Sequence, residues 1–307
     1  MFNPKSDIDV TAAAALLEHY WGCSVTDVTF LTGGNLSSVF SFNHSGSGYV
    51  IRFSGLEDAF QTERYIADLL SAQGVPYPRV IGQGTAGSCV YAISERVEGI
   101  VVADLPEDGK SALLPDLVRV IAKMNQVKLD SSSSGYGWID PDGNGRYPAW
   151  ERFLVSFFQE DQTGTFWEGW HDLFHTSFLE KDVFEECYAR LMSYAPYNAP
   201  HRYFVHGDCH AWNILSDGRG ITGIIDGNCV YGDFLIDVSI AEGVIPGRNV
   251  ILAFRDHYER LGIPIPDFKE RMLGARYFKG LDGLRFYAKM GWKPAYKKLK
   301  SDLLALV

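Results

Sequence analysis

Alternation between hydrophobic and polar residues dominates the first hundred positions and predicts a series of short β-strands. Each such segment is rich in β-branched and aromatic residues, and turns containing Gly, Pro or Asn separate the segments. The predicted strands are 25–31, 37–42, 49–54, 79–83 and 89–97. Two segments have helical spacing instead: 10–21, which stops before Gly22, and 57–73, which stops before Gly74.

The pattern becomes mainly helical after Gly99. The predicted helices are 110–128, 148–161, 180–195, 233–245, 248–262 and 266–290. A polar stretch at 131–147 is predicted to be a long loop, and loops of that length in a compact domain tend to be functional or mobile. We therefore predict an α+β fold with two lobes. Residues 1–97 form a small lobe with an antiparallel sheet and a helix, and residues 98–307 form a mainly helical lobe.

The segment HGDCHAWN at 206–213 is followed by a turn signal, SDGRG, and by an apolar run that ends at Asp226. If the chain folds back at that turn as a hairpin, residues whose numbers sum to about 439 lie opposite each other. Asn213 and Asp226 meet this condition, so their side chains are predicted to converge. Two oxygen ligands suit Mg²⁺, which keeps several of its waters in proteins. Asp208 then lies close to whatever the metal ion holds.

Two other interpretations of this segment remain open. His206 and His210 flank Asp208, and the pattern H-x-D-x-H is compatible with a metallohydrolase site. That site would need further ligands downstream, where His257 lies in no such context. Alternatively, Asp208 caps a turn and Asp226 ends a strand, without any chemical role.

The composition narrows the classes of function. The chain has 28 basic and 38 acidic residues, a net charge of −10. This balance argues against nonspecific nucleic-acid binding, which depends on Lys and Arg, and is compatible with a cationic substrate. The five cysteines form no CxxC pair and are typical of reduced thiols. The sequence shows neither a membrane-length apolar run nor a signal-peptide pattern, so we expect a cytoplasmic protein without a membrane partner.

The catalytic segments resemble a known family. HGDCHAWN, followed by IIDGNCVYGDFLID at 224–237, resembles the core shared by protein kinases and the aminoglycoside phosphotransferases. Segments between about residues 30 and 240 are similar to the hygromycin-B phosphotransferase group. Besides the two segments above, they are LTGGNLSSVFSFNHSGSGYVIRF, ISERVEGIVVADLP and SGYGWIDPDGNGRYPAWERF. Two features depart from that group: HGDCHAWN is nearer the general phosphotransferase pattern, and Gly227 stands where an aromatic residue is common.

The resemblance implies a protein-kinase-like fold of two lobes and transfer of a phosphoryl group from ATP or GTP with Mg²⁺. Asp208 would be the catalytic residue that receives the proton of the acceptor hydroxyl. Asn213 and Asp226 would hold the metal ion. The remaining motif residues would brace the catalytic loop. They are His206, His210, Asp233 and Asp237. His210 would alternatively orient Asp208, and the alternative for Asp237 is to face substrate.

Arg52 and Glu63 are predicted to form an ion pair in the small lobe. Glu63 shares an apolar helical face with Ile66, Ala67 and Leu70, and a carboxylate there is costly unless it is paired. The kinase pattern has a Lys at the position of Arg52, which would contact the nucleotide phosphates. Arg can bind phosphate oxygens through two donors. The alternative is an Arg52 side chain that faces solvent.

Two further segments are expected to meet the nucleotide. Gly34, Ser37 and Ser38 lie where a phosphate-covering hairpin belongs, although an ordinary turn explains this piece nearly as well. Glu95 and Val97 lie at the expected junction of the lobes, where their backbone groups would meet the base.

The acceptor is expected to be a hydroxylated small molecule, cationic in the case of an aminoglycoside, with hygromycin B as the first candidate. Alternatives are a macrolide, choline, a sugar or another metabolite, and a nucleotide-binding pseudokinase that acts through protein contacts. Asp172, Glu242 and Asp282 are candidates for binding ammonium groups, or are solvated surface carboxylates. Cys209 and Cys229 lie beside the expected site and are either oxidation-sensitive or inert.

Overall fold

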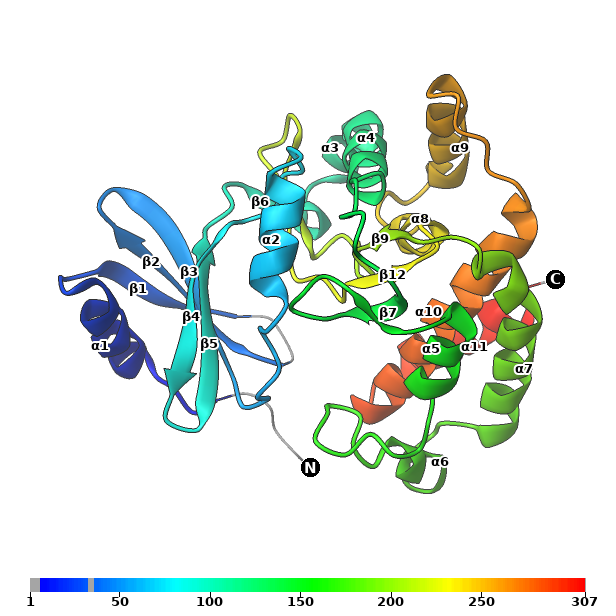
Figure 1. Ribbon diagram of the computed structural model, residues 1–307, viewed down its shortest axis with the longest axis horizontal. Coiled ribbons are helices and arrows are strands. Elements are labelled where there is room, and N and C mark those ends of the chain that lie inside the picture. The colour runs from blue at the N-terminus through cyan, green and yellow to red at the C-terminus, as the bar shows by residue number, and fades with distance from the viewer. Residues whose placement is uncertain (1–5, 33–35, 307) are drawn as a thin grey trace. The chain divides into compact units, whose positions relative to one another are not determined.

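A five-stranded antiparallel sheet is the centre of the N-terminal unit in the computed structural model, which describes residues 6–32 and 36–306 (Figure 1). The strand order is β1-β2-β3-β5-β4. The strands are β1 (Thr26–Leu31), β2 (Ser38–His44), β3 (Ser47–Ser54), β4 (Val80–Ala86) and β5 (Cys89–Glu95). This unit comprises residues 1–98 together with 164–166. The five strands agree with those predicted from alternation.

Helix α1 (Val10–Trp21) covers one side of this sheet and ends where the sequence predicts. The Asp9 side chain accepts a hydrogen bond from the Ala12 amide (2.8 Å), and Gly22 takes the left-handed conformation at the other end. Ala13 and Leu17 of the helix pack with apolar side chains of the sheet. The sheet residues of this core are Phe40, Phe42, Ile51, Phe53 and Ile93.

Helix α2 (Glu63–Ser71) is shorter than predicted, because residues 57–62 form turns instead of a first helical segment. Isolated bonds to the third preceding carbonyl, such as Ala59 N to Leu56 O (3.2 Å), replace the continuous helical ladder. Ile66, Ala67 and Leu70 of α2 are buried, as the helical spacing predicts.

Helices make up most of the second unit, which comprises residues 99–163 and 167–307. They are η1 (Val102–Asp104), α3 (Glu107–Ala112), α4 (Leu114–Asn125), α5 (Trp150–Phe157), η2 (Trp170–Asp172), α6 (Leu173–Thr176), α7 (Lys181–Asn198), α8 (Leu235–Ala241), α9 (Val250–Arg260), α10 (Phe268–Lys289) and α11 (Lys293–Leu304). The long helix α10 packs against α7, α8 and α11 (Figure 1). Its buried residues include Leu273, Tyr277, Leu281 and Leu284.

Two small sheets complete this unit. One has the order β11-β10-β6 and joins β6 (Ile100–Val101), β10 (Ile214–Ser216) and β11 (Ile221–Ile224). The other has the order β8-β7-β12-β9 and joins β7 (Tyr136–Ile139), β8 (Gly145–Tyr147), β9 (Tyr203–Val205) and β12 (Val230–Gly232). Both sheets end at the loops that carry the HGD segment and Asp226.

The prediction of a loop at 131–147 is wrong, because this segment contains the hairpin β7–β8. The Asp140 side chain accepts hydrogen bonds from the amides of Asp142 (3.0 Å) and Asn144 (2.8 Å), which closes the turn between the strands. The predicted helix 110–128 is likewise two helices, α3 and α4, and Pro115 lies in the first turn of the second. Helix α11 was not predicted.

None of the helices within residues 6–32 and 36–306 combines the length and the apolar character that a membrane crossing requires.

Candidate active site

The HGD segment begins where strand β9 ends, and Asp237 of helix α8 fixes this beginning. The Asp237 carboxylate accepts hydrogen bonds from the amides of His206 (2.9 Å) and Gly207 (2.8 Å) and from the side chain of Asn125 (2.7 Å). Burial raises the pKa of Asp237, although these hydrogen bonds act in the opposite direction. Gly207 has φ +75°, and a Cβ atom there would lie 2.3 Å from the Asn228 carbonyl oxygen, so only glycine fits.

His206 is fully buried, and its side chain contacts the backbone of the loop two residues later. Its Nδ1 atom accepts a hydrogen bond from the Asp208 amide (3.3 Å), so the imidazole is neutral at that nitrogen. Burial lowers the pKa of His206, and nearby carboxylates only partly oppose this effect. The uncharged imidazole of His206 therefore accepts this hydrogen bond and holds the backbone of Asp208 in place.

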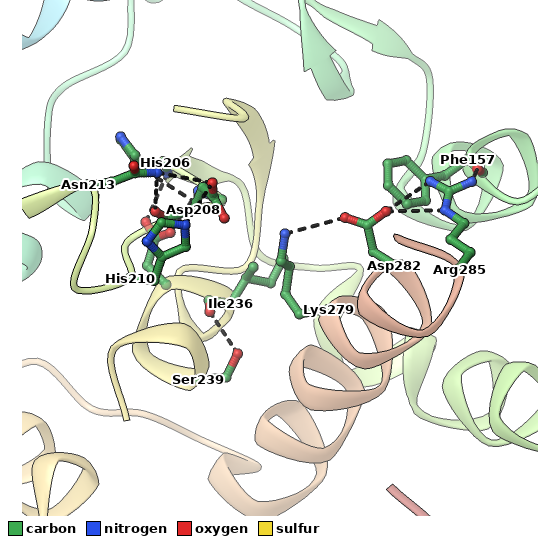
Figure 2. Close-up of polar contacts among 12 residues, drawn as sticks. Phe157, His206, Asp208, His210, Asn213, Ile236, Ser239, Lys279, Asp282 and Arg285 are labelled. Atoms are coloured by element: carbon green, nitrogen blue, oxygen red, sulfur yellow. Dashed lines mark hydrogen bonds and ion pairs between the residues drawn. The ribbon is translucent and has the colours of Figure 1, made fainter. Parts of the chain in front are cut away.

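Asp208 is half-buried, with 35% of its side chain exposed, and lies among polar partners. Its Oδ2 atom lies 3.0 Å from Asn213 Nδ2 and 3.4 Å from His210 Nε2 (Figure 2). Burial alone would raise the pKa of Asp208. The hydrogen bond from His210 and the positive charge of Lys279 outweigh burial, and the pKa is lowered. Asp208 is consequently an ionised acceptor in neutral solution.

Asn213 and Asp226 do approach each other, but the predicted register is off by one residue. The observed pairs Ile214–Ile224 and Leu215–Gly223 place Asn213 opposite Ile225, whose amide donates to the Asn213 carbonyl (2.9 Å). Asp226 follows in the left-handed region (φ +60°), where the chain leaves the hairpin. The Asn213 Nδ2 atom then lies 3.4 Å from the Asp226 carbonyl oxygen, so the two residues are neighbours all the same.

The donor set at this point fits a hard divalent cation. The Asn213 Nδ2 atom is the donor to Asp208 and Asp226, which leaves its Oδ1 atom as the oxygen for a metal ion. Asp226 adds an exposed carboxylate, and Mg²⁺ commonly takes one or two protein oxygens and several waters. Over residues 6–32 and 36–306, no group of three His, Cys, Asp or Glu side chains could hold a metal ion. The metallohydrolase interpretation therefore lacks the ligands that it needs.

Gly227 stands where an aromatic residue is common in the hygromycin group, and the packing around it leaves no room for a side chain. A Cβ atom at this position would lie 2.5 Å from Cys229 Sγ and 3.0 Å from the His206 ring. Cys229 and Cys209 are both buried, and burial raises the pKa of the Cys209 thiol well above its usual range. Cys209 is thus an inert thiol that fills space beside the loop.

The hydrogen bonds of Asp233 differ from the expected bracing of the loop. Its two carboxylate oxygens accept from Arg271 Nε and Nη2 of α10, both at 2.8 Å, and from Asn198 of α7 (2.8 Å). Asp233 also accepts from the Leu235 amide at the start of α8 (3.0 Å). Both charged partners are almost completely buried. Asp233 thus joins α7, α8 and α10, while Asp237 makes the contacts with the loop itself.

The expected ion pair of the N-terminal unit is present. Arg52 Nη2 lies 2.5 Å from Glu63 Oε2, and the two side chains are 17% and 18% exposed. Arg52 also lies over the ring of Phe60 (5.2 Å to its centre). The side chain therefore does not face solvent. The pair fixes an arginine between β3 and α2.

The other expected nucleotide contacts are less well supported by local geometry. The Ser38 hydroxyl donates to the Ser6 carbonyl (2.9 Å), and Ser37 is half-buried. The Glu95 amide donates to the Arg79 carbonyl (3.0 Å) and its carboxylate pairs with Arg79, while Val97 is half-buried after β5. Gly34 lies outside the described residues.

Helix α10 contributes a charged group that sequence analysis missed. Lys279 Nζ lies 3.5 Å from Asp282 Oδ2, and Asp282 also accepts from Arg285 Nη2 (3.0 Å), as Figure 2 shows. Asp282, expected to bind ammonium groups or solvent, is therefore already paired with two cations. Glu242 is paired with Arg276. No motif or spacing marks Lys279, because a lysine on an amphipathic helix usually belongs to its solvated face.

An antiparallel sheet with a paired helix, followed by a helical unit that carries the HGD loop and a hairpin, defines the kinase-like class of phosphotransferases. A model of the phosphotransferase enzyme family, which includes the aminoglycoside phosphotransferases, matches residues 27–268. The chain belongs to this family.

Known relatives support the same assignment. The chain is 30% identical over 222 residues to hygromycin-B 4-O-kinase of Escherichia coli, an alignment that covers 70% of this chain and 62% of that enzyme. It is similar to the aminoglycoside phosphotransferase APH(4)-Ia in a ternary complex with AMP-PNP and hygromycin B. That similarity has a TM-score of 0.78 at 26% identity and covers 96% of this chain and 97% of that one. Spectinomycin phosphotransferase APH(9)-Ia shares the fold, with a TM-score of 0.67 at 14% identity over 98% and 99% of the two chains.

Proposed function

We propose that this protein transfers the γ-phosphoryl group of ATP or GTP, with Mg²⁺, to a hydroxyl group of an aminoglycoside, with hygromycin B as the first candidate. The observation that carries the proposal is the contact of Asn213 Nδ2 with the Asp208 carboxylate and with the backbone carbonyl of Asp226. These contacts bring an ionised acceptor next to two residues whose side chains can bind a metal ion. The 30% identity to hygromycin-B 4-O-kinase supports the choice of acceptor.

In this mechanism the acceptor hydroxyl lies beside Asp208. Its oxygen attacks the γ-phosphorus while the bond from that phosphorus to the β–γ bridging oxygen breaks, and the hydroxyl proton passes to Asp208. The lowered pKa of Asp208 keeps the carboxylate ready to accept that proton, and His210 and Asn213 hold its orientation. A divalent cation held by Asn213 and Asp226 would neutralise charge on the phosphates.

We assign the nucleotide to residues 1–97 and the acceptor to residues 98–307. Arg52, fixed by Glu63, would bind the phosphates through its planar guanidinium. Gly34, Ser37 and Ser38 would cover the phosphates, and backbone groups of Glu95 and Val97 would meet the base. With its Oγ committed to Ser6, Ser38 would contribute its backbone. We expect this chemistry to take place in the cytoplasm and to confer resistance to the acceptor.

The test is ADP release by the purified protein over a panel of aminoglycosides, macrolides, choline and neutral sugars. We expect acceptor-dependent turnover that Asp208→Asn lowers by about 10²-fold or more, the scale of removing a positioned base. Asp302→Asn on α11 is the matched control, because it removes an exposed carboxylate. Normal turnover of Asp208→Asn would refute the role of Asp208. A complete lack of acceptor-dependent ADP release would instead favour a pseudokinase.

A further inference from the structure

Lys279 lies on the side of Asp208 opposite to Asn213 (Figure 2). In Figure 2, Asn213 lies on one side of Asp208, and Lys279 of α10 lies on the other side, between Asp208 and Asp282, with its ammonium contact directed to Asp282. The positive charge of Lys279 adds to the hydrogen bond from His210 in lowering the pKa of Asp208 against the effect of burial. The acceptor hydroxyl must approach Asp208 from a direction that Asn213 and Asp226 leave open. A side chain on the open side of Asp208 is in a position to contact the bound acceptor.

The position of Lys279 is fixed by a chain of charged contacts along α10. Asp282 accepts from Lys279 through Oδ2 and from Arg285 through Oδ1, at 3.5 and 3.0 Å. Arg285 is fully buried and donates to the Phe157 carbonyl (3.0 Å). Its guanidinium also lies over the ring of Trp167, 3.8 Å from the ring centre. A buried arginine thus holds the aspartate that holds Lys279.

The same contacts leave a net positive charge in this cluster of α10. Asp282 supplies one negative charge against the two positive charges of Lys279 and Arg285. An ammonium has three N–H donors, and the ion pair with Asp282 engages Lys279 on one side, so donors remain for an oxygen of a ligand. The side chain is 20% exposed, which lets a ligand reach it while limiting the screening of its charge.

We propose that Lys279 is a specificity-determining residue that donates a hydrogen bond to a neutral or anionic oxygen next to the reacting hydroxyl of the acceptor and disfavours an ammonium group there. This inference deepens the proposed function and rests on it, because it takes Asp208 as the group that receives the hydroxyl. An aminoglycoside would then be phosphorylated on a hydroxyl-rich part of the molecule. Its ammonium groups would lie away from the carbon that bears the reacting hydroxyl.

The experiment compares matched pairs of acceptors that differ at one ring position next to a phosphorylated hydroxyl, with an amino group in one member and a hydroxyl in the other. The wild-type protein is expected to have a kcat/KM about tenfold higher for the hydroxyl member, because like charges a few ångströms apart repel even in a partly solvated site. Lys279→Met and Lys279→Gln should each remove most of this preference. The change should appear mainly in KM, because ground-state binding is affected.

Two controls separate a local effect from a general change in charge. Lys279→Arg keeps the cation and should keep the preference. Lys298→Met makes the same change in net charge at a lysine of α11 that is 79% exposed, and should also keep it. An unchanged preference in both neutral variants would overturn the proposal.

A second measurement does not depend on any variant. The phosphorylated carbon of each wild-type product can be identified by ³¹P–¹H NMR, and the proposal expects no amino group on the adjacent carbons. Phosphorylation next to an amino group as the main product would overturn it. If only neutral sugars accept phosphate, the aminoglycoside assignment fails and the role of Lys279 is decided on those sugars. If no acceptor on the panel is phosphorylated, both proposals fail.

Discussion

At the scale of single residues, Asp237 does more for the candidate catalytic loop than its distance in sequence suggests. A fully buried carboxylate holds two consecutive loop amides and the Asn125 side chain. Sequence analysis placed Asp237 in the motif because it follows Asp233 at family spacing. Sequence could not predict that Asp237 binds the loop amides and Asp233 binds Arg271, because this depends on which helices approach each carboxylate in three dimensions.

Asp237→Asn should therefore lower both stability and activity. One of the two loop amides would face an NH₂ group instead of an oxygen, and leaving a buried donor unsatisfied costs about 1–3 kcal/mol. Urea unfolding should show a decrease of that size, with a loss of kcat. Asp302→Asn, which breaks an exposed pair, should change stability by less than about 1 kcal/mol. Equal stability of the two variants would contradict the anchoring role of Asp237.

Gly227→Ala tests the packing around His206. The new methyl group would lie 2.5 Å from Cys229 Sγ, and such overpacking costs about 1–3 kcal/mol. The double variant with Cys229→Ala should recover part of the loss, because the sulfur is then absent. The measurement is the free energy of unfolding of the two single variants and the double variant. No recovery in the double variant would mean that the His206 ring is the main obstacle.

At the scale of elements, strands and most long helices could be predicted, and the failures have local physical causes. The order β1 to β5 with α1 follows from alternation and caps. The hairpin β7–β8 was missed because its strands are short and its closing turn, built on Asp140, reads as a polar loop. The register of β10 with β11 was missed by one residue, because the pairing shifts between Leu215 and Ser216. No pattern in the sequence marks such a shift.

Helix α10 offers a matched pair of arginines for a test of its attachment. Arg271→Met would leave Asp233 buried without its charged partner, which costs about 3–5 kcal/mol. Arg276→Met on the same helix breaks a partly exposed pair with Glu242 and should cost less than about 1 kcal/mol. Chemical unfolding of both variants gives the comparison. Similar losses in the two would show that the Asp233–Arg271 pair does not secure the helix.

At the scale of the whole molecule, the pH dependence of stability should reflect two histidines, His206, which is fully buried, and His201, which is partly buried. The pKa of His206 is lowered by burial, and that of His201 is lowered by burial and by Arg271. Each binds a proton more readily in the unfolded chain. Their contribution to stability is therefore complete above the unfolded pKa of about 6.5 and is lost as the pH falls through the lowered folded values.

We accordingly expect the free energy of unfolding to decrease when the pH is lowered from neutral to below about 6.5. His206→Asn combined with His201→Gln should make this pH dependence shallower, whatever the variant's stability at neutral pH. Urea unfolding curves over that range provide the measurement. Asp208, with its lowered pKa, adds a separate loss in acid that begins below its unfolded pKa of about 3.9. An equally steep dependence in the double variant would assign the effect to other groups.

Helix α10 has a consequence for how enzymes of this kind diversify. Arg271 near its start is buried and pairs with Asp233. Lys279, two helical turns later, is partly exposed and pairs with Asp282. Replacements at that one partly exposed position should disturb folding less than replacements of the buried Arg271. Under the role proposed for Lys279, a different acceptor would be accommodated by a single codon change on this helix.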